Sequence, residues 1–477
     1  MGKVNRREFL KQPVICASSA GAILAQGLRK RPNIIWIMAD DLGYADLGCY
    51  GQKTIQTPNI DRLAAEGMRF TNAYAGCTVC APSRNVLMTG LHGGHTTVRS
   101  NPGGVGIRES DVTVAQVLKS AGYKTGCFGK WGLGDIGTAG VPWKHGFDQF
   151  FGYLHQIHAH FYYPPYLWDN DRKFPLAGNR DGKRATYSHD IIASRSLDFI
   201  RTHKEGRFFL YVPFTIPHME YLVPPDSVDQ YRSKLPEVAP IPPGHYAAQP
   251  YPRAAYAGMV TRMDRDVGKI MALLKELDLD KNTVVFFTSD NGPIFPQGQT
   301  DFFKSAGPLR GHKQQMYEGG IRVPMIARWP GRIRSETVSD LPWYFADLLP
   351  TAAELAGVKP PPGLDGMSVV PTLLGAKVAG HRQTKHEFMY WELPPYDNKT
   401  GGFRAGAPMQ AVRMGDWKAV RPKADAPLEL YNLKQDPGET TDVAARNPKI
   451  RERIEEYLKT ARVEPPLQPE PKSEWHF

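Results

Sequence analysis

The sequence predicts an α/β fold: a large α/β/α sandwich with a central, mostly parallel (mixed) sheet, followed by a smaller C-terminal domain. Two observations support this prediction. Short, almost uninterrupted apolar runs, of which 33–39 and 283–289 are the clearest, alternate with helical patterns over most of the chain. Such runs are typical of strands buried on both faces of a parallel sheet. The last part of the chain instead has four short segments and a charged amphipathic helix, which predict a four-stranded antiparallel sheet with a packed helix.

Strands and helices are expected to alternate along the large domain. The expected strands are 33–39, 68–74, 123–128, 208–214, 283–289 and 322–329, and the expected helices are 58–66, 82–91, 113–120, 188–201, 251–277 and 341–356. In the smaller domain, strands are expected at 388–392, 410–414, 417–421 and 428–433, and a helix at 450–461. The proline-rich run 359–363 breaks regular structure. We therefore predict a catalytic domain over 31–375 and a C-terminal α+β domain over 376–477.

The first 26 residues resemble a twin-arginine export signal. Arg6 and Arg7 precede an uncharged stretch, 13–25, which is rich in apolar and small residues and too short to span a bilayer. We predict a signal peptide over 1–26 and an exported protein that is periplasmic or secreted. A short buried helix and a signal anchor are the alternatives. No later segment has the length and apolarity of a membrane span, so none is expected.

The chain is strongly basic. Its 59 lysines and arginines outnumber its 48 aspartates and glutamates, which gives a formal net charge of +11. A summed positive field attracts polyanions, although a basic surface can also be merely solvated. The sequence contains no helix-turn-helix, zinc-finger or RNA-binding signature, so no nucleic acid partner is predicted.

Cys80 is predicted to lie at the beginning of a helix. Pro82 suits the first helical position, where its missing N–H has no cost. Backbone N–H groups and the helix dipole favour an anion at this point, and Arg84 adds a permanent positive charge. The sequence therefore predicts an anion site beside Cys80, whereas Cys49 and Cys127 are expected to be small buried residues.

Polar residues follow the carboxyl ends of four predicted strands. These residues are Asp40 and Asp41, Lys130, His218, and Asp290 with Asn291. Open α/β sheets bind ligands at that edge. Adjacent carboxylates at the end of a buried strand need a positive partner, and Ca²⁺ prefers carboxylate oxygens. We expect a divalent cation there; a polar strand-to-loop turn is the alternative.

Together these blocks resemble the type I, formylglycine-dependent sulfatases of the alkaline phosphatase superfamily. The signature Cys-x-Pro-Ser-Arg is present at 80–84, and the other blocks stand in the family's order. They are Asp40-Asp41, Gly129-Lys130-Trp131, Pro217-His218, Asp290-Asn291-Gly292, Lys313 before Glu318-Gly319-Gly320, and the closing segments 430–433 and 436–439. The resemblance covers nearly the whole chain after the predicted signal peptide.

The resemblance implies a sulfuric ester hydrolase that uses a modified cysteine and a metal ion. Cys80 would be oxidised to formylglycine (3-oxoalanine), whose hydrate attacks sulfur. The implied Ca²⁺ ligands are Asp40, Asp41, the modified Cys80, Asp290 and Asn291. The implied catalytic residues are Cys80, Arg84, Lys130, His218 and Lys313, of which the three cationic residues neutralise the sulfuryl oxygens and His218 protonates the leaving oxygen.

Candidate substrate-binding residues lie in two loops. The long loop after the Cys80 helix contains His95, Arg99 and Asn101, and its length and polarity suggest a pocket wall. His158 stands in a second, aromatic-rich loop that either stacks on sugars or packs on the core. The basic charge and predicted export favour a sulfated carbohydrate, foremost a polysaccharide, as substrate. The resemblance also implies a partner, a formylglycine-generating or anaerobic sulfatase-maturating enzyme.

One residue departs from the family pattern. The family commonly has Lys-Trp-His-Leu-Gly, but this chain has Gly132 between Trp131 and Leu133. The missing imidazole is the implied base for the second half of the reaction. Gly132 therefore keeps open the alternative of a catalytically impaired sulfatase-like protein that binds glycans. A phosphodiester or phosphonate hydrolase of the same superfamily is the other alternative to a carbohydrate sulfatase.

Overall fold

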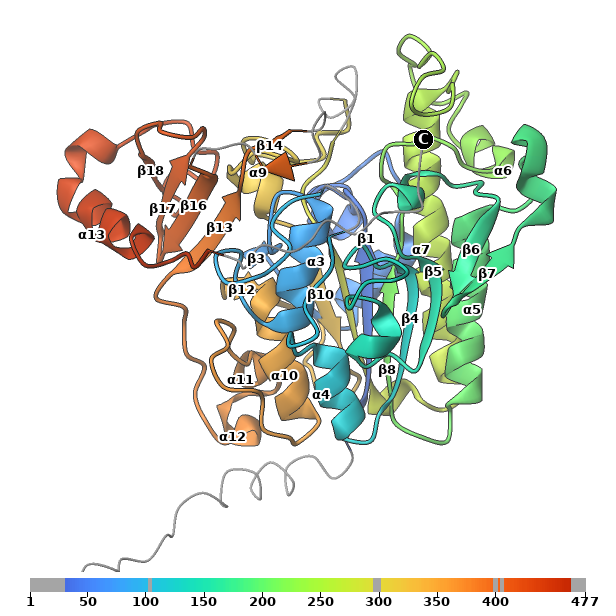
Figure 1. Cartoon of the computed structure of the whole chain (residues 1–477), viewed down its shortest axis with the longest axis horizontal. Coiled ribbons are helices and arrows are strands. Elements are labelled where there is room, and N and C mark those ends of the chain that lie inside the picture. The colour runs from blue at the N-terminus through green and yellow to red at the C-terminus, as the bar shows by residue number, and fades with distance from the viewer. Residues whose placement is uncertain (1–30, 102–104, 295–301, 398–401, 404–406, 465–477) are drawn as a thin grey trace, which may run out of the picture.

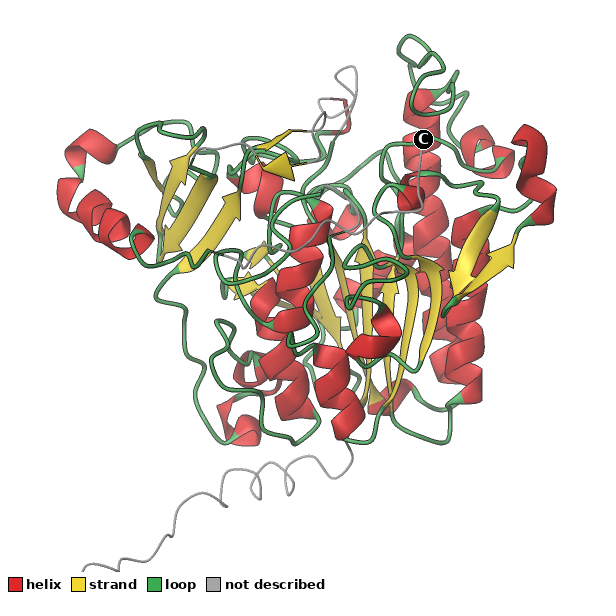
Figure 2. Cartoon of the chain, viewed as in Figure 1, coloured by secondary structure: helices red, strands yellow, loops and turns green. Residues whose placement is uncertain are grey.

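The computed structural model describes residues 31–101, 105–294, 302–397, 402–403 and 407–464, and confirms the predicted fold class. A ten-stranded mixed sheet forms the centre of the molecule, and a separate four-stranded antiparallel sheet lies to one side (Figures 1 and 2). The predicted signal peptide, 1–26, lies outside the described residues. Within the described ranges, none of the helices combines the length and apolarity needed to traverse a bilayer.

The large sheet has the strand order β11-β2-β10-β9-β1-β8-β4-β5-β6-β7. Its strands are β1 (Asn33–Ala39), β2 (Met68–Phe70), β4 (Lys124–Lys130), β5 (Gln149–Tyr153), β6 (Tyr166–Asp169), β7 (Arg172–Pro175), β8 (Phe208–Pro213), β9 (Thr283–Ser289), β10 (Met325–Arg328) and β11 (Thr337–Ser339). The five adjacent strands from β9 to β5 are all parallel. Strands β10, β6 and β7 are antiparallel to their neighbours, so the sheet is mixed.

Helices cover both faces of this sheet, as the two cores show. Every residue of β1 is buried, and successive side chains point to opposite faces. Trp36 belongs to one core together with α3 (Cys80–Thr89), α4 (Val114–Ser120) and α10 (Leu348–Leu355). Ile37 belongs to the other core, with α2 (Pro58–Ala65), α5 (Ser188–Thr202) and α7 (Pro252–Glu276). This layering explains why the strand sequences are continuously apolar.

The smaller sheet has the order β13-β16-β17-β18, and all its neighbours are antiparallel. Its strands are β13 (Met389–Leu393), β16 (Met409–Met414), β17 (Trp417–Arg421) and β18 (Glu429–Asn432), and α13 (Pro448–Leu458) packs on it through Ile454. The remaining elements are β3 (Ala73–Tyr74) paired with β12 (Trp343–Tyr344), β14 (Tyr396–Asp397) paired with β15 (Gly402–Phe403), and the short helices α6 (Pro225–Asp229), α9 (Glu318–Ile321), α11 (Val370–Leu374) and α12 (Ala376–Ala379).

A buried ion cluster joins the smaller sheet to the rest of the molecule. The ammonium group of Lys418, on β17, lies 2.9 Å from a carboxylate oxygen of Glu318 and 2.9 Å from one of Glu439. All three side chains are fully buried. Nearby, the indole N–H of Trp391 donates to the carbonyl of Ala75 at 2.7 Å. The two sheets therefore share a desolvated polar interface.

Three local predictions need correction. The expected helix 341–356 begins only at Leu348, because Trp343–Tyr344 pairs as β12 with β3. The expected strand 68–74 is two strands, β2 and β3, which belong to different sheets. Helix α3 begins at Cys80, so Pro82 is its third residue; that position also has no intrahelical N–H partner, and proline is tolerated there.

Candidate active site

Charged residues meet at the carboxyl edge of the parallel strands. Ala39 of β1 pairs with Ser289 of β9, so the residues that follow, Asp40 and Asp290, emerge side by side. Lys130 is the last residue of β4, two strands away from β1. Its ammonium group lies 2.7 Å from a carboxylate oxygen of Asp40, and both side chains are fully buried. The strand register thus brings together residues that are far apart in the sequence.

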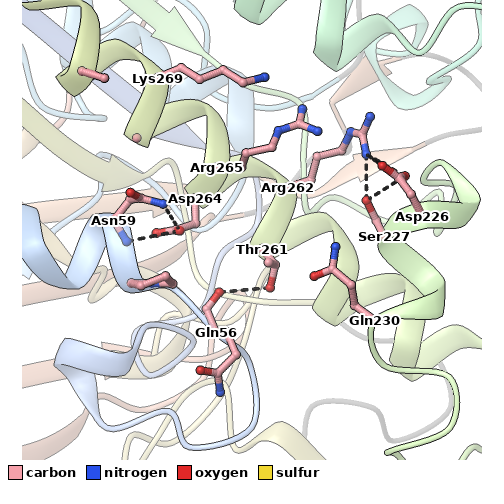
Figure 3. Close-up of a pocket in the computed structure, with 13 residues that line it drawn as sticks. Gln56, Asn59, Asp226, Ser227, Gln230, Thr261, Arg262, Asp264, Arg265 and Lys269 are labelled. Atoms are coloured by element: carbon pink, nitrogen blue, oxygen red, sulfur yellow. Dashed lines mark hydrogen bonds and ion pairs between the residues drawn. The ribbon is translucent and has the colours of Figure 1, made fainter.

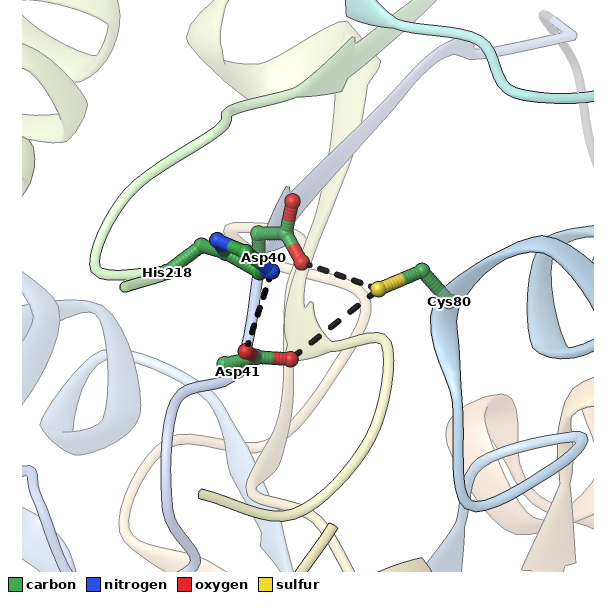
Figure 4. A group of neighbouring side chains, drawn as sticks. All are labelled: Asp40, Asp41, Cys80 and His218. Atoms are coloured by element: carbon green, nitrogen blue, oxygen red, sulfur yellow. Dashed lines mark hydrogen bonds and ion pairs between the residues drawn. The ribbon is translucent and has the colours of Figure 1, made fainter. Parts of the chain in front are cut away.

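Cys80 faces this edge from the start of α3 (Figure 4). It is 0% exposed, and its Sγ lies 3.3 Å from Oδ1 of Asp40 and 4.0 Å from Oδ1 of Asp41. The Nζ of Lys313 lies 3.4 Å from the same sulfur. The Nε2 of His218 lies 3.6 Å from Oδ2 of Asp41. The predicted nucleophile, acid and carboxylates therefore form one cluster.

Arg84 holds the cluster together one turn into α3. Its Nε and Nη2 donate to Oδ2 of Asp290 at 3.1 and 2.6 Å, and its Nη1 donates to the carbonyl of Lys130 at 2.6 Å. Nη2 also lies 3.7 Å from Asp40. Because planar bidentate contacts fix geometry as well as charge, this guanidinium sets the position of Asp290 relative to β4.

Three carboxylates meet three cations in this cluster, so their formal charges balance, and burial is the main cause of the raised carboxylate pKa values. Burial raises the pKa of Asp41 to about 6, and Asp40 and Asp290 add to the effect against Lys313. Burial likewise raises the pKa of Asp290, with Asp40 as a second cause. Burial also acts to raise the pKa of Asp40, but Lys130, Arg84 and Lys313 outweigh it and hold that pKa well below its usual range.

The same residues fit a divalent cation. Asp40, Asp41, Cys80 and His218 present ligand atoms that all lie within 4.8 Å of one another. Asn291 is fully buried, and its Oδ1 accepts no hydrogen bond from the residues that the structure describes. Its Nδ2, rather than its Oδ1, faces Asp41 and donates to Oδ1 of that carboxylate at 2.7 Å. Carboxylate and amide oxygens are the hard ligands that Ca²⁺ and similar divalent cations prefer.

The predicted substrate-binding residues are not all near Cys80. Asn101 is, because its Oδ1 accepts from the N–H of Ala81 at 2.7 Å, at the start of α3. His95 instead pairs with Asp365 at 2.8 Å, beyond the end of α3. Arg99 is buried and pairs with Glu392 at 3.1 Å, against the smaller sheet.

His158 is also buried, and its ring lies between those of Tyr153 and Tyr166, at 4.9 and 4.8 Å. The loop that contains it therefore packs on the core at this residue. Two residues further on, partly exposed His160 stacks on His218 with ring centroids 4.2 Å apart. The hydroxyl of Tyr246 lies 3.4 Å from Nδ1 of His160. The aromatic wall beside His218 thus involves His160 and Tyr246.

Gly132 lies beside the cluster in a left-handed conformation, with φ of +75°. A Cβ there would lie 2.6 Å from Oε1 of Gln156 and 4.0 Å from Cδ of Arg84. Sequence reasoning missed Gln156 because no local pattern marks it. Only the pairing of β4 with β5 brings its loop to this position.

A separate surface pocket lies between α2, α6 and α7 (Figure 3). Its basic side chains are already paired with carboxylates: Arg262 with Asp226 at 2.9 Å, Arg265 with Asp266 at 2.8 Å, and Lys269 with Asp266 at 2.7 Å. The residues that line this pocket include no cysteine and no histidine, so the pocket does not reproduce the chemistry of the cluster around Cys80.

Comparison with known proteins identifies the family. The Sulfatase family model matches residues 32–358, and the model of the C-terminal part of N-sulphoglucosamine sulphohydrolase matches residues 311–464. The chain is 34% identical to N-acetylgalactosamine-6-sulfatase of Rattus norvegicus, over 87% of this chain and 75% of that protein. It is 32% identical to arylsulfatase A of Homo sapiens, over 93% of this chain and 89% of that protein.

Comparison with solved structures supports the same family. The crystal structure of Ps i-CgsB superimposes with a TM-score of 0.75 at 30% identity, covering 91% of this chain and 94% of that one. The same protein has been solved in complex with k-i-k-neocarrahexaose. With its α/β sandwich, its carboxylate-lined strand edge and these relatives, the chain belongs to the sulfatase family of the alkaline phosphatase superfamily and is a sulfatase, a sulfuric ester hydrolase.

Proposed function

We propose that this sulfatase removes sulfate from a sulfated carbohydrate, with Cys80 in its formylglycine form as the nucleophile and Ca²⁺ as the cofactor. The observation that carries the proposal is the position of Cys80: its sulfur lies between the Asp40 carboxylate at 3.3 Å and the Lys313 ammonium at 3.4 Å. An oxygen nucleophile built at this point would have both a metal-binding carboxylate and a cation within reach.

The residues that would hold the ion are Asp40, Asp41, Asp290 and Asn291, together with the modified Cys80. The unpaired Oδ1 of Asn291 and the raised pKa of Asp41 support this assignment. A cation would give the amide oxygen a partner and would favour the ionised form of the buried carboxyl. When bound, Ca²⁺ would supply charge that lowers the pKa of a nearby hydroxyl and orients sulfate oxygens. Ca²⁺ is favoured over softer metals because the donor set is mostly oxygen.

The protein's own cations then have distinct roles. Lys313 and Lys130 lie on either side of the carboxylate pair, where their ammonium groups can bind sulfuryl oxygens as charge shifts toward them in the transition state. Arg84 fixes the position of Asp290. His218 faces Asp41 with Nε2, and burial together with Lys313 holds its pKa well below the usual range. We propose that the arriving anionic ester raises this pKa, so that His218 gives a proton to the departing sugar oxygen.

The proposal of a carbohydrate substrate is supported by the net charge of the chain and by its relatives. The net charge of +11 favours a polyanion, which a positive field concentrates near the surface. Relatives carry names or bound molecules of this class: one is an N-acetylgalactosamine-6-sulfatase, and another was solved with a neocarrahexaose.

We further propose that the twin-arginine signal over 1–26 directs export, so that the protein is periplasmic or secreted. We also propose that a maturation enzyme oxidises Cys80, and that the chain divides into domains 31–375 and 376–477.

Two measurements test the proposal. Peptide mass spectrometry of protein made with a maturation enzyme is expected to find the Cys80 peptide about 18 Da lighter, since sulfur and two hydrogens are exchanged for oxygen. Sulfate release from sulfated oligosaccharides is expected from this protein and not from Cys80→Ser. Cys77→Ser is the matched control, because Cys77 is also buried but lies against the carbonyl of Glu392 and outside the cluster.

Two outcomes would overturn the proposal. Faster hydrolysis of a phosphodiester or phosphonate than of a sulfate ester would favour the phosphoester alternative. Retention of a sulfated glycan without sulfate release, from protein whose Cys80 is fully converted, would favour an impaired glycan-binding protein; Gly132 is the residue that motivates this second candidate.

A further inference from the structure

We infer that Gln156 is a positioning residue of the active site, whose side-chain amide donates a hydrogen bond to an oxygen of the substrate's sulfate group. The inference rests on the proposed function, which it deepens by naming a group that no local sequence pattern marks. It is carried by two independent observations: the space beside Gly132, and the lack of a protein partner for the Gln156 amide.

Gln156 occupies the space into which a side chain at position 132 would extend. A Cβ on Gly132 would approach Oε1 of Gln156 to 2.6 Å, closer than real contacts allow. The two segments are tied together, because Trp131 N–H donates to the carbonyl of Tyr153 at 2.9 Å and Gly132 N–H to that of Leu154 at 3.1 Å. The amide therefore stands where the family pattern has an imidazole, beside Gly132, whose Cβ position is itself 4.0 Å from Cδ of Arg84.

The amide is buried without a partner. Gln156 is 2% exposed, and neither its Nε2 nor its Oε1 has a hydrogen-bond partner among the residues that the structure describes. Leaving a buried polar group unpaired costs about 1–3 kcal/mol. Such a group needs a hydrogen-bond partner from outside the described protein, and beside a cluster that handles an anionic ester a sulfate oxygen can be that partner. A neutral amide can donate to a sulfate oxygen but cannot accept a proton as imidazole does, so its role is to position the sulfate.

The decisive variant is Gln156→Met, which keeps the length and volume of the side chain and removes its hydrogen bonds. We expect kcat for a sulfate ester to fall about 100-fold, the effect of losing one well-placed donor. The melting temperature should stay equal or rise, because an unsatisfied amide is replaced by an apolar group. If Gln156 had a purely structural role, Gln156→Met would lower both kcat and the melting temperature. Wild-type kcat and KM in Gln156→Met would overturn the inference.

A paired substitution tests the shared space. Gly132→His is expected to lose activity because its backbone has φ of +75° and its side chain displaces the end of Gln156. Gly132→His with Gln156→Gly removes the second cause and is expected to regain at least tenfold over Gly132→His alone. Gly137→His is the matched control: Gly137 also has positive φ, +85°, but open space around it, so this variant reports backbone strain alone. Equal activity of Gly132→His and the double variant would contradict the shared-space argument.

A readout without turnover separates this inference from the proposed function. Inorganic sulfate is expected to raise the melting temperature of the wild type more than that of Gln156→Met. If the wild type released no sulfate from esters but kept this difference, the proposed function would fall and the role of Gln156 would stand. An equal shift in both proteins would overturn the role of Gln156, whatever the activity.

Discussion

Replacing Arg84 by lysine separates the charge of this side chain from its geometry. Lysine keeps one positive charge in a fully buried position. It cannot make the fork in which Nε and Nη2 both reach Oδ2 of Asp290 while Nη1 reaches the carbonyl of Lys130. A single ammonium on a shorter stem can satisfy at most one of these two acceptors well.

The magnitude follows from the contacts that are lost. Hydrogen bonds to charged groups contribute about 1.5–3 kcal/mol each, and lysine loses two of the three that Arg84 makes. We therefore expect Arg84→Lys to lose about 3–5 kcal/mol of stability. We also expect kcat to fall about 100-fold or more, because Asp290 would no longer be held against β4.

The assay compares melting temperature and sulfate release for Arg84→Lys and Arg262→Lys. Arg262 is the control because it is also buried, at 8% exposed, and forked onto Asp190 and Asp226, but it lies outside the cluster around Cys80. Both variants should melt earlier, and only Arg84→Lys should lose kcat. If Arg84→Lys kept more than half of the wild-type kcat, charge alone would be sufficient and the geometric argument would be wrong.

Three further predictions concern the ion, a buried acid and a loop. Removing Ca²⁺ with a chelator should lower the melting temperature, and re-addition at 100 times the dissociation constant should restore about 2.7 kcal/mol; an unchanged melting temperature would count against an ion at this site. Burial raises the pKa of Glu220 from 4.5 to about 7, so its stabilising contribution, about 3 kcal/mol, is complete below pH 4.5 and lost as the pH rises through 7. In Glu220→Gln, the free energy of unfolding in urea should change less between pH 4.5 and pH 7 than in the wild type. An unaltered pH dependence would refute the raised pKa of Glu220. Asn101→Ala should cost about 1 kcal/mol in thermal unfolding by removing the acceptor for Ala81 N–H, whereas Asn101→Asp should keep it; equal losses in both would contradict this account.

The sequence predicted best what is buried on both faces. Strands 33–39 and 283–289 are found with those same ends as β1 and β9, because a run that is apolar at every position has one stable place in this fold. The convergence of Asp40 and Asp290 follows directly, since residues after adjacent parallel strands must meet.

What could not be predicted depends on contacts between distant segments. The sequence gives 341–356 a helical pattern, yet Trp343–Tyr344 pairs with β3, and this tertiary pairing overrides the local preference. The polarity of their loop predicts a substrate-binding role for His95 and Arg99, which stays a prediction, but no local pattern indicates their partners, Asp365 and Glu392. Such partners are hundreds of positions away and leave no local mark.

The buried triad of Lys418, Glu318 and Glu439 has a consequence for how the chain can be divided. A fragment ending at residue 375 would keep Glu318 in the interior but lose the ammonium 2.9 Å away, and the indole of Trp391 would no longer cap the carbonyl before the Cys80 turn. Arg322, 2.5 Å from Glu318, would stay in the fragment, but the Glu318 oxygen that faces Lys418 would be left buried without its partner, which is destabilising. The smaller sheet is thus an integral part of the packed interior. Shortened variants should therefore be truncated near the chain termini and not between the two sheets.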